Sequence, residues 1–154
     1  MFIEFLFIIQ PFIGNQLLSQ FAPNTLNPQT KNWYRKLKKS SFTPPNYVFP
    51  IVWTILYILL GVNLIINYKN SGKKEFLVQY FIAYEIQLFL NFAWSLSFFG
   101  FKKPKVSLAI VTAMIGITGY LLWKSWKINK KAFWVLLPYG IWIAFAFYLN
   151  YSLI

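Results

Sequence analysis

The residues best suited to chemistry in this chain are aromatic rings and amides that recur at helical spacing inside apolar stretches. One face carries large rings at intervals of four residues and ends on a glycine: Phe49, Trp53, Tyr57 and Gly61. A second face carries two amides and an indole: Gln87, Asn91 and Trp94. A third places four residues within about 80° of arc: Tyr139, Trp142, Ala146 and Asn150. Taken singly, each face is explained at least as well by helix packing. If the faces converge, they line a slot suited to a flat, mostly apolar ligand.

Other kinds of chemistry are excluded by residues that the chain lacks. It contains no Cys and no His, which rules out disulfides, thiolate catalysis, zinc fingers, His-ligated metals and Ser/His/Asp triads. No acid/base pair supports a conventional turnover mechanism. We therefore expect neither a metal nor a cofactor.

The elements that position these faces must lie in a membrane. The chain is 58% hydrophobic and only 12% charged, which is too apolar for an ordinary soluble domain. Its formal charge of +12 raises the question of nucleic acid. The Lys and Arg residues, however, lie in short runs that border apolar segments, where lipid phosphates are the nearer anions. We expect contact with membrane lipids and no nucleic-acid partner.

Uncharged stretches between the basic runs predict an all-α integral membrane protein with a bundle of about five transmembrane helices. Residues 1–154 form one domain with spans near 5–21, 46–67, 76–99, 106–123 and 132–153. The first span is the most polar, and it can cross the bilayer if Gln10, Asn15 and Gln16 face protein. Residues 22–45 have no apolar period and predict a long extramembrane loop.

Three further features of the sequence can each be interpreted in two ways. Glu85 lies about 200° around its helix from Gln87, so it either faces a partner subunit or reaches toward the membrane surface. The small residues Ala109, Ala113, Gly116 and Gly119 predict a packing seam rather than a site. The basic run of Arg35, Lys36, Lys38 and Lys39 suits lipid headgroups better than a ligand clamp.

Three stretches of the chain resemble one known family. WYRKLKKSSFTPPNYVFPIVWTILYILLG (Trp33–Gly61) is similar to the signature of the tryptophan-rich sensory protein family, also called the translocator protein or peripheral benzodiazepine receptor family. EIQLFLNFAWSLSFFG (Glu85–Gly100) and AFWVLLPYGIWIAFAFYLN (Ala132–Asn150) look like its third-helix and fifth-helix motifs.

The resemblance implies a five-helix bundle, commonly a homodimer, that binds porphyrins such as protoporphyrin IX. By matching position, it implies a pocket formed by Trp53, Asn91, Trp94, Trp142, Phe145, Ala146 and Leu149, with the loop that bears Trp33 as its lid. Two departures matter. Ser40 and Phe42 stand where the family usually has Pro and Trp, which removes a loop indole. Tyr151 is followed by no basic residue, so sterol binding by the family's usual pattern is not expected.

These observations give a leading hypothesis and an alternative. The leading hypothesis is a membrane-embedded sensory protein that stacks a porphyrin on Trp53, Trp94 and Trp142 and holds its propionates near Arg35, Lys36 or Lys38. The alternative is a light- and oxygen-dependent porphyrin-degrading enzyme with Trp53 and Trp142 as candidate electron donors. We expect a homodimer in a bacterial inner membrane, with the mitochondrial outer membrane as the alternative location.

Overall fold

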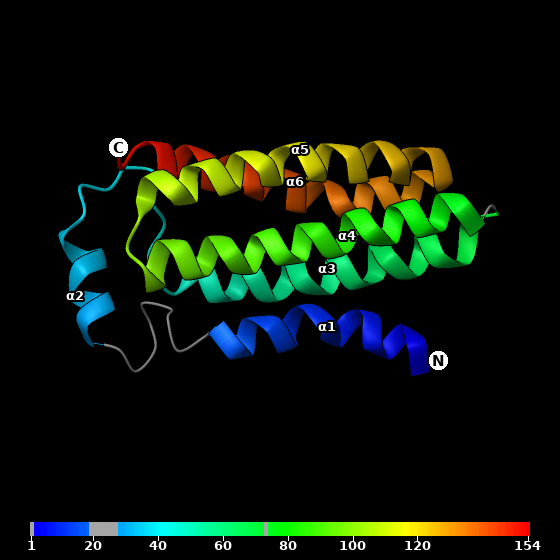
Figure 1. Cartoon of the computed structure of the whole chain (residues 1–154), viewed down its shortest axis with the longest axis horizontal. Helices are drawn as coiled ribbons and strands as arrows, with labels where there is room; N and C mark the ends of the chain where they lie inside the picture. The colour runs from blue at the N-terminus through cyan, green and yellow to red at the C-terminus, as the bar shows by residue number, and fades with distance from the viewer. Residues whose placement is uncertain (1, 19–27, 73) are drawn as a thin grey trace.

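The computed structural model describes residues 2–18, 28–72 and 74–154. Within these ranges the chain is helical, with no strand. The helices are α1 (Phe2–Leu18), α2 (Pro28–Lys36), α3 (Val48–Asn70), α4 (Lys74–Ser95), the π-helix η2 (Leu96–Gly100), α5 (Pro104–Ile128) and α6 (Lys130–Tyr151). Figure 1 shows α3 to α6 as a bundle, α1 beside α3, and α2 across one end. The two termini lie at opposite ends of the bundle.

Four of the predicted spans are confirmed as helices long and apolar enough to cross a membrane: Val48–Asn70, Lys74–Gly100, Pro104–Ile128 and Lys130–Tyr151. Their boundaries follow local signals, since Pro104 occupies the first turn of α5 and the Asn129 side chain caps α6 by accepting from the Lys131 N–H. The first predicted span is not confirmed in this way. The apolar part of α1, Glu4–Ile13, is shorter than a span, and the side chains of Asn15 and Gln16 lie outside the described residues.

The long extramembrane loop predicted over residues 22–45 contains a helix that the sequence did not indicate, and its residues 22–27 lie outside the described ranges. Residues Pro28–Lys36 form α2, which buries Thr30 and Tyr34 one turn apart. The helix has nine residues and only a short buried stripe, so its hydrophobic periodicity is too short to distinguish a helix from a loop in the sequence. Its stability depends on tertiary packing, because helices this short are marginal alone.

Helix α1 packs on α3 at Gly61. A Cβ placed on Gly61 would lie 2.7 Å from the Cα of Ile8, so only glycine allows the two backbones to approach this closely. The glycine at the end of the aromatic face therefore serves helix packing. By contrast, the predicted seam on α5 is open, because a Cβ placed on Gly116 or Gly119 would meet no neighbouring helix or side chain of the described residues within 4 Å.

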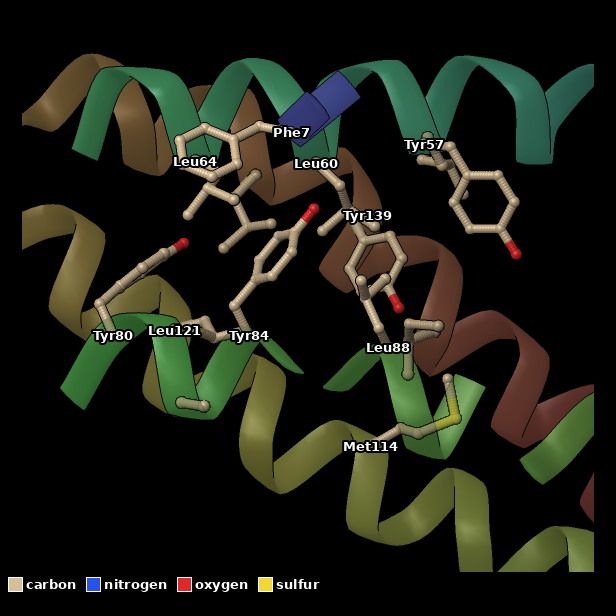
Figure 2. Close-up of a cluster of buried hydrophobic side chains, with 14 of the residues drawn as sticks. Phe7, Tyr57, Leu60, Leu64, Tyr80, Tyr84, Leu88, Met114, Leu121 and Tyr139 are labelled. Atoms are coloured by element: carbon tan, nitrogen blue, oxygen red, sulfur yellow. The ribbon is translucent and has the colours of Figure 1, made fainter. Parts of the chain in front are cut away.

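The core between the helices combines leucines with four buried tyrosines, Tyr57, Tyr80, Tyr84 and Tyr139 (Figure 2). At the end of the bundle away from α2, Asn63 joins four helices. Its amide donates to Ser125 Oγ on α5 (3.2 Å) and to the Ala132 carbonyl on α6 (2.8 Å), and its Oδ1 accepts from Tyr80 on α4. Polar side chains thus hold this end of the bundle together.

Candidate functional site

A small hollow with a volume of about 40 Å³, open in part to the outside, lies at the end of the bundle covered by α2. We call it the pocket. Its walls come from four parts of the chain: α2 with the segment after it, α3, α4 with η2, and α6 with the residues after it. The lining residues are Tyr34, Lys39, Thr43, Phe49, Trp94, Phe98, Phe99, Ala146, Leu149, Asn150 and Leu153. Most of this lining is aromatic or aliphatic, which is typical of a site for an apolar ligand.

The end of α4 supplies the aromatic wall. Phe98 and Phe99 lie in the π-helix η2, a wide turn that is often found at functional sites. The ring of Trp94 stacks on Phe98 with centroids 5.3 Å apart and an angle of 15°, and Phe99 meets Phe98 edge-on at 4.8 Å. These three side chains form one continuous wall of rings.

Residues 28–45, which we call the lid, close the pocket from outside the bundle. The rings of Trp33 and Tyr34 pack edge-on against Phe98 and Phe99 at centroid distances of 5.6 to 6.4 Å. Burial raises the pKa of the Tyr34 hydroxyl. The lid therefore rests on ring contacts, each worth about 0.5–1.5 kcal/mol beyond area burial.

Asn150 fixes the orientation of the pocket indole. The Trp94 N–H donates to Asn150 Oδ1 at 3.0 Å, and the Asn150 amide donates to the Pro104 carbonyl at 2.9 Å. One buried amide thus joins α4, α6 and the start of α5. Both Trp94 and Asn150 were predicted site residues, and both line the pocket together with the predicted Ala146 and Leu149.

Four other predicted site residues meet in a buried network instead. The Tyr57 hydroxyl donates to Asn91 Oδ1 at 3.0 Å, and the amides of Gln87 and Asn91 donate to the Tyr139 oxygen at 2.6 and 3.2 Å. All four side chains are at most 2% exposed. They come from α3, α4 and α6, so the three predicted faces do converge. Because these four are not part of the pocket lining, their bonds serve to join helices.

The remaining predicted rings are not part of the pocket lining. Trp53 packs on Tyr57 at 5.4 Å and on Tyr139 at 6.5 Å. Trp142 packs edge-on against Phe49, which lines the pocket, at 6.0 Å, and against Phe145 at 5.5 Å. Of the three indoles expected to stack on a ligand, Trp94 alone is part of the lining.

The sequence model of the TspO/MBR family matches residues 7–154. This chain belongs to the TspO/MBR family. The tryptophan-rich protein TspO of Chlorobaculum tepidum is 38% identical over 144 residues, covering 92% of this chain and 90% of that protein. The tryptophan-rich sensory protein of Cereibacter sphaeroides is 32% identical over 133 residues, covering 85% and 82%. The translocator protein of Bos taurus is 29% identical over 149 residues, covering 96% and 85%.

Membership of the TspO/MBR family confirms the resemblance drawn from the three sequence stretches. Two departures from the family pattern meet in the structure at α6. Ser40 Oγ lies 3.1 Å from the Tyr148 hydroxyl, and the Phe42 ring meets the Tyr148 ring at 6.2 Å. In this TspO/MBR member, the altered lid residues therefore attach the lid to α6.

Sequence reasoning missed the basic residue of the site in this TspO/MBR chain. Arg35, Lys36 and Lys38, the residues expected near ligand carboxylates, are not part of the pocket lining. Lys39 lines the pocket, and its ammonium lies 4.4 Å from the centroid of the Tyr34 ring. Tyr34, Phe98 and Phe99 were also missed. The dense run of aromatics near the end of α4 was the available signal for Phe98 and Phe99.

Glu85 has one polar partner among the described residues of its own chain. The Gln10 amide nitrogen of α1 lies 2.6 and 2.7 Å from the two carboxylate oxygens of Glu85 within the same chain. The expectation that Glu85 turns away from the pocket agrees with this contact. Gln10 is a neutral donor, so this contact does not decide whether Glu85 also faces a second subunit, and the homodimer stays a prediction.

Among the residues that the structure describes, no group of His, Cys, Asp or Glu is arranged to hold a metal ion.

Proposed function

We propose that this TspO/MBR protein is a membrane-embedded binding and sensory protein for porphyrins, such as protoporphyrin IX, or for similar flat apolar ligands, acting in tetrapyrrole regulation or transport. The observation that carries the proposal is a pocket walled by rings with one lysine in its lining. Rings favour a flat conjugated body, and the ammonium favours a carboxylate at its edge. The chain has no His, so imidazole ligation of iron is impossible and a metal-free macrocycle is the better fit.

The proposal extends to the arrangement of the chain in the membrane. We propose that α1 also crosses the membrane, which adds a fifth span to the four of α3 to α6, since residues 5–30 carry no charge. We assign the protein to a bacterial inner membrane, with the mitochondrial outer membrane as the alternative, and we expect a homodimer.

Lys39 gives the sharpest test of the proposal. Protoporphyrin IX is titrated against the purified chain in neutral lipid nanodiscs, with binding followed by quenching of Trp fluorescence. We expect Lys39→Met to weaken binding about tenfold, or ~1.4 kcal/mol, because a charge-assisted contact is lost. The matched control, Lys38→Met, changes a neighbour that is not part of the lining and should bind like the parent.

Binding of the dimethyl ester of the porphyrin shows whether the effect of Lys39→Met comes from the lost charge or from a changed pocket shape. The ester lacks the carboxylates, so the parent and Lys39→Met should bind it equally. An equal loss in both lysine variants would contradict the assignment of Lys39. Absence of porphyrin binding by the parent would overturn the proposed function.

The enzymatic alternative retains one supporting observation. Trp94 lines the pocket, whereas Trp53 and Trp142 are not part of its lining, so Trp94 is the indole best placed to donate an electron to an excited porphyrin. This alternative would be favoured if porphyrin absorbance were lost only when light, oxygen and protein were present together. The loss should also stop in Trp94→Phe while binding persists. Bleaching at the same rate without protein would remove the alternative.

A further inference from the structure

Glu85 is an ionisable residue in the middle of a span. It lies eleven residues after Lys74 and ten before Ser95, the two ends of α4. Such a position corresponds to the centre of the hydrocarbon layer, where acidic side chains are costly and commonly have a function. The pocket lies on another face of the helix, and its lining does not include this carboxylate.

The contacts of Glu85 within the chain leave its charge uncompensated. Its described polar partner is the amide of Gln10, a neutral donor at 2.6 and 2.7 Å. No salt bridge joins Glu85 to a basic side chain in the ranges that the structure describes, whereas Glu4 has Lys69 at 2.7 Å. A carboxylate can accept about four hydrogen bonds, so the amide leaves acceptor capacity unused. The side chain is half-buried, which keeps it accessible from the lipid side.

Aromatic rings lie one turn before and one turn after the carboxylate on the same face of α4. Phe81 is 37% exposed and Phe89 is 70% exposed. Ring faces attract cations, and they do so more strongly where water is excluded. The exposed Ile82 and Ile86 continue this surface with apolar contacts. A negative group between two rings, set in an apolar surface, has the composition of an amine-recognition site.

We propose that Gln10 and Glu85, with Phe81 and Phe89, form a second binding site that opens to the lipid and takes a lipophilic cation. The ligand class is a protonated amine or quaternary nitrogen on an apolar body. The cation supplies the missing countercharge, the rings contact its faces, and the Gln10 amide orients the carboxylate. Because α1 already covers one side of Glu85, the remaining opening suits a small cation better than a basic helix of another protein.

A flat fluorescent cation, an N-methyl styrylpyridinium dye, tests the proposal on the full chain in phosphatidylcholine nanodiscs. We expect saturable binding to the parent and binding about tenfold weaker to Glu85→Gln, which keeps a polar group for Gln10 but removes the charge. Glu75→Gln, which removes an exposed acid from the first turn of the same helix, is the matched control and should bind like the parent. The neutral, unmethylated styrylpyridine should not distinguish Glu85→Gln from the parent.

A lipophilic carbodiimide provides an independent readout. The chain has three acidic residues, so modification can be located by mass spectrometry. We expect one modified residue, Glu85, and protection of it by the cationic dye. Three results would each overturn the proposal. These are dye binding to Glu85→Gln that equals binding to the parent, dye binding to the parent no greater than to empty discs, and modification of Glu85 that the dye does not reduce. Helix content and size-exclusion profiles of the variants establish that they are folded, independently of whether the pocket binds a porphyrin.

Discussion

Replacement of Asn63 by Leu is expected to destabilise the bundle at the end away from the pocket. The side chain is fully buried in α3 and takes part in three hydrogen bonds, to Ser125, to the Ala132 carbonyl and from Tyr80. Leucine has a similar size but can make none of them. The substitution therefore leaves a buried hydroxyl and a buried carbonyl with fewer partners.

The magnitude follows from hydrogen bonds measured inside membrane proteins, which average about 0.6 kcal/mol and reach about 1.7 kcal/mol. Three lost bonds correspond to about 2 kcal/mol in the free energy of unfolding. The fully buried Tyr80 hydroxyl loses the acceptor for its proton and keeps only the hydrogen bond from Ser125, so the cost should not fall much below this value even though leucine adds apolar surface.

Reversible unfolding by sodium dodecyl sulfate in mixed micelles, followed by Trp fluorescence, measures the change. Asn70→Leu is the matched control, because Asn70 lies two turns later on the same helix, is exposed, and its side chain donates to the Ile66 carbonyl of its own helix. We expect it to cost less than about 0.5 kcal/mol. Equal losses for the two variants, or a loss below about 0.5 kcal/mol for Asn63→Leu, would refute the reasoning.

Three further predictions concern packing and the pocket. Gly61→Val should lower the free energy of unfolding by about 1–3 kcal/mol in the same assay, because its side chain meets the Ile8 backbone, whereas Gly116→Val should be tolerated. Ala146→Phe should block porphyrin titration while leaving the circular dichroism spectrum unchanged, because a ring fills the pocket. Trp94→Phe should weaken porphyrin binding more than the double change of Trp53 and Trp142 to Phe; the reverse order in fluorescence titration would contradict the assigned lining.

The spans were predictable because the bilayer imposes a simple rule on sequence. Charges end each helix, so four spans were found to within a few residues of their ends, apart from the last turn of α5. The inward faces were also predictable, since helical spacing alone puts Gln87 and Asn91 on one side. Spacing could not say whether these amides would face a ligand or each other.

Contacts between distant segments could not be predicted from spacing. Gln10 and Glu85 are 75 residues apart, and no periodicity connects them. Lys39 is one of several similar lysines in a polar segment, and only the path of the chain after α2 brings it to the pocket. In each case, tertiary geometry decides between residues that are equivalent in sequence.

The two ends of the bundle are held together by different forces, and this difference bears on how a ligand enters. At the Asn63 end, directional hydrogen bonds join four helices, and any separation would expose unpaired polar groups to hydrocarbon. At the pocket end, the lid rests on rings, whose contacts can be replaced by contacts with the rings of a ligand. A flat aromatic ligand can therefore displace Trp33 or Tyr34 from Phe98 and Phe99 at small net cost, whereas no apolar ligand could replace the bonds of Asn63. Opening should accordingly be confined to the lid and η2, with the Asn63 network as the fixed base of the bundle.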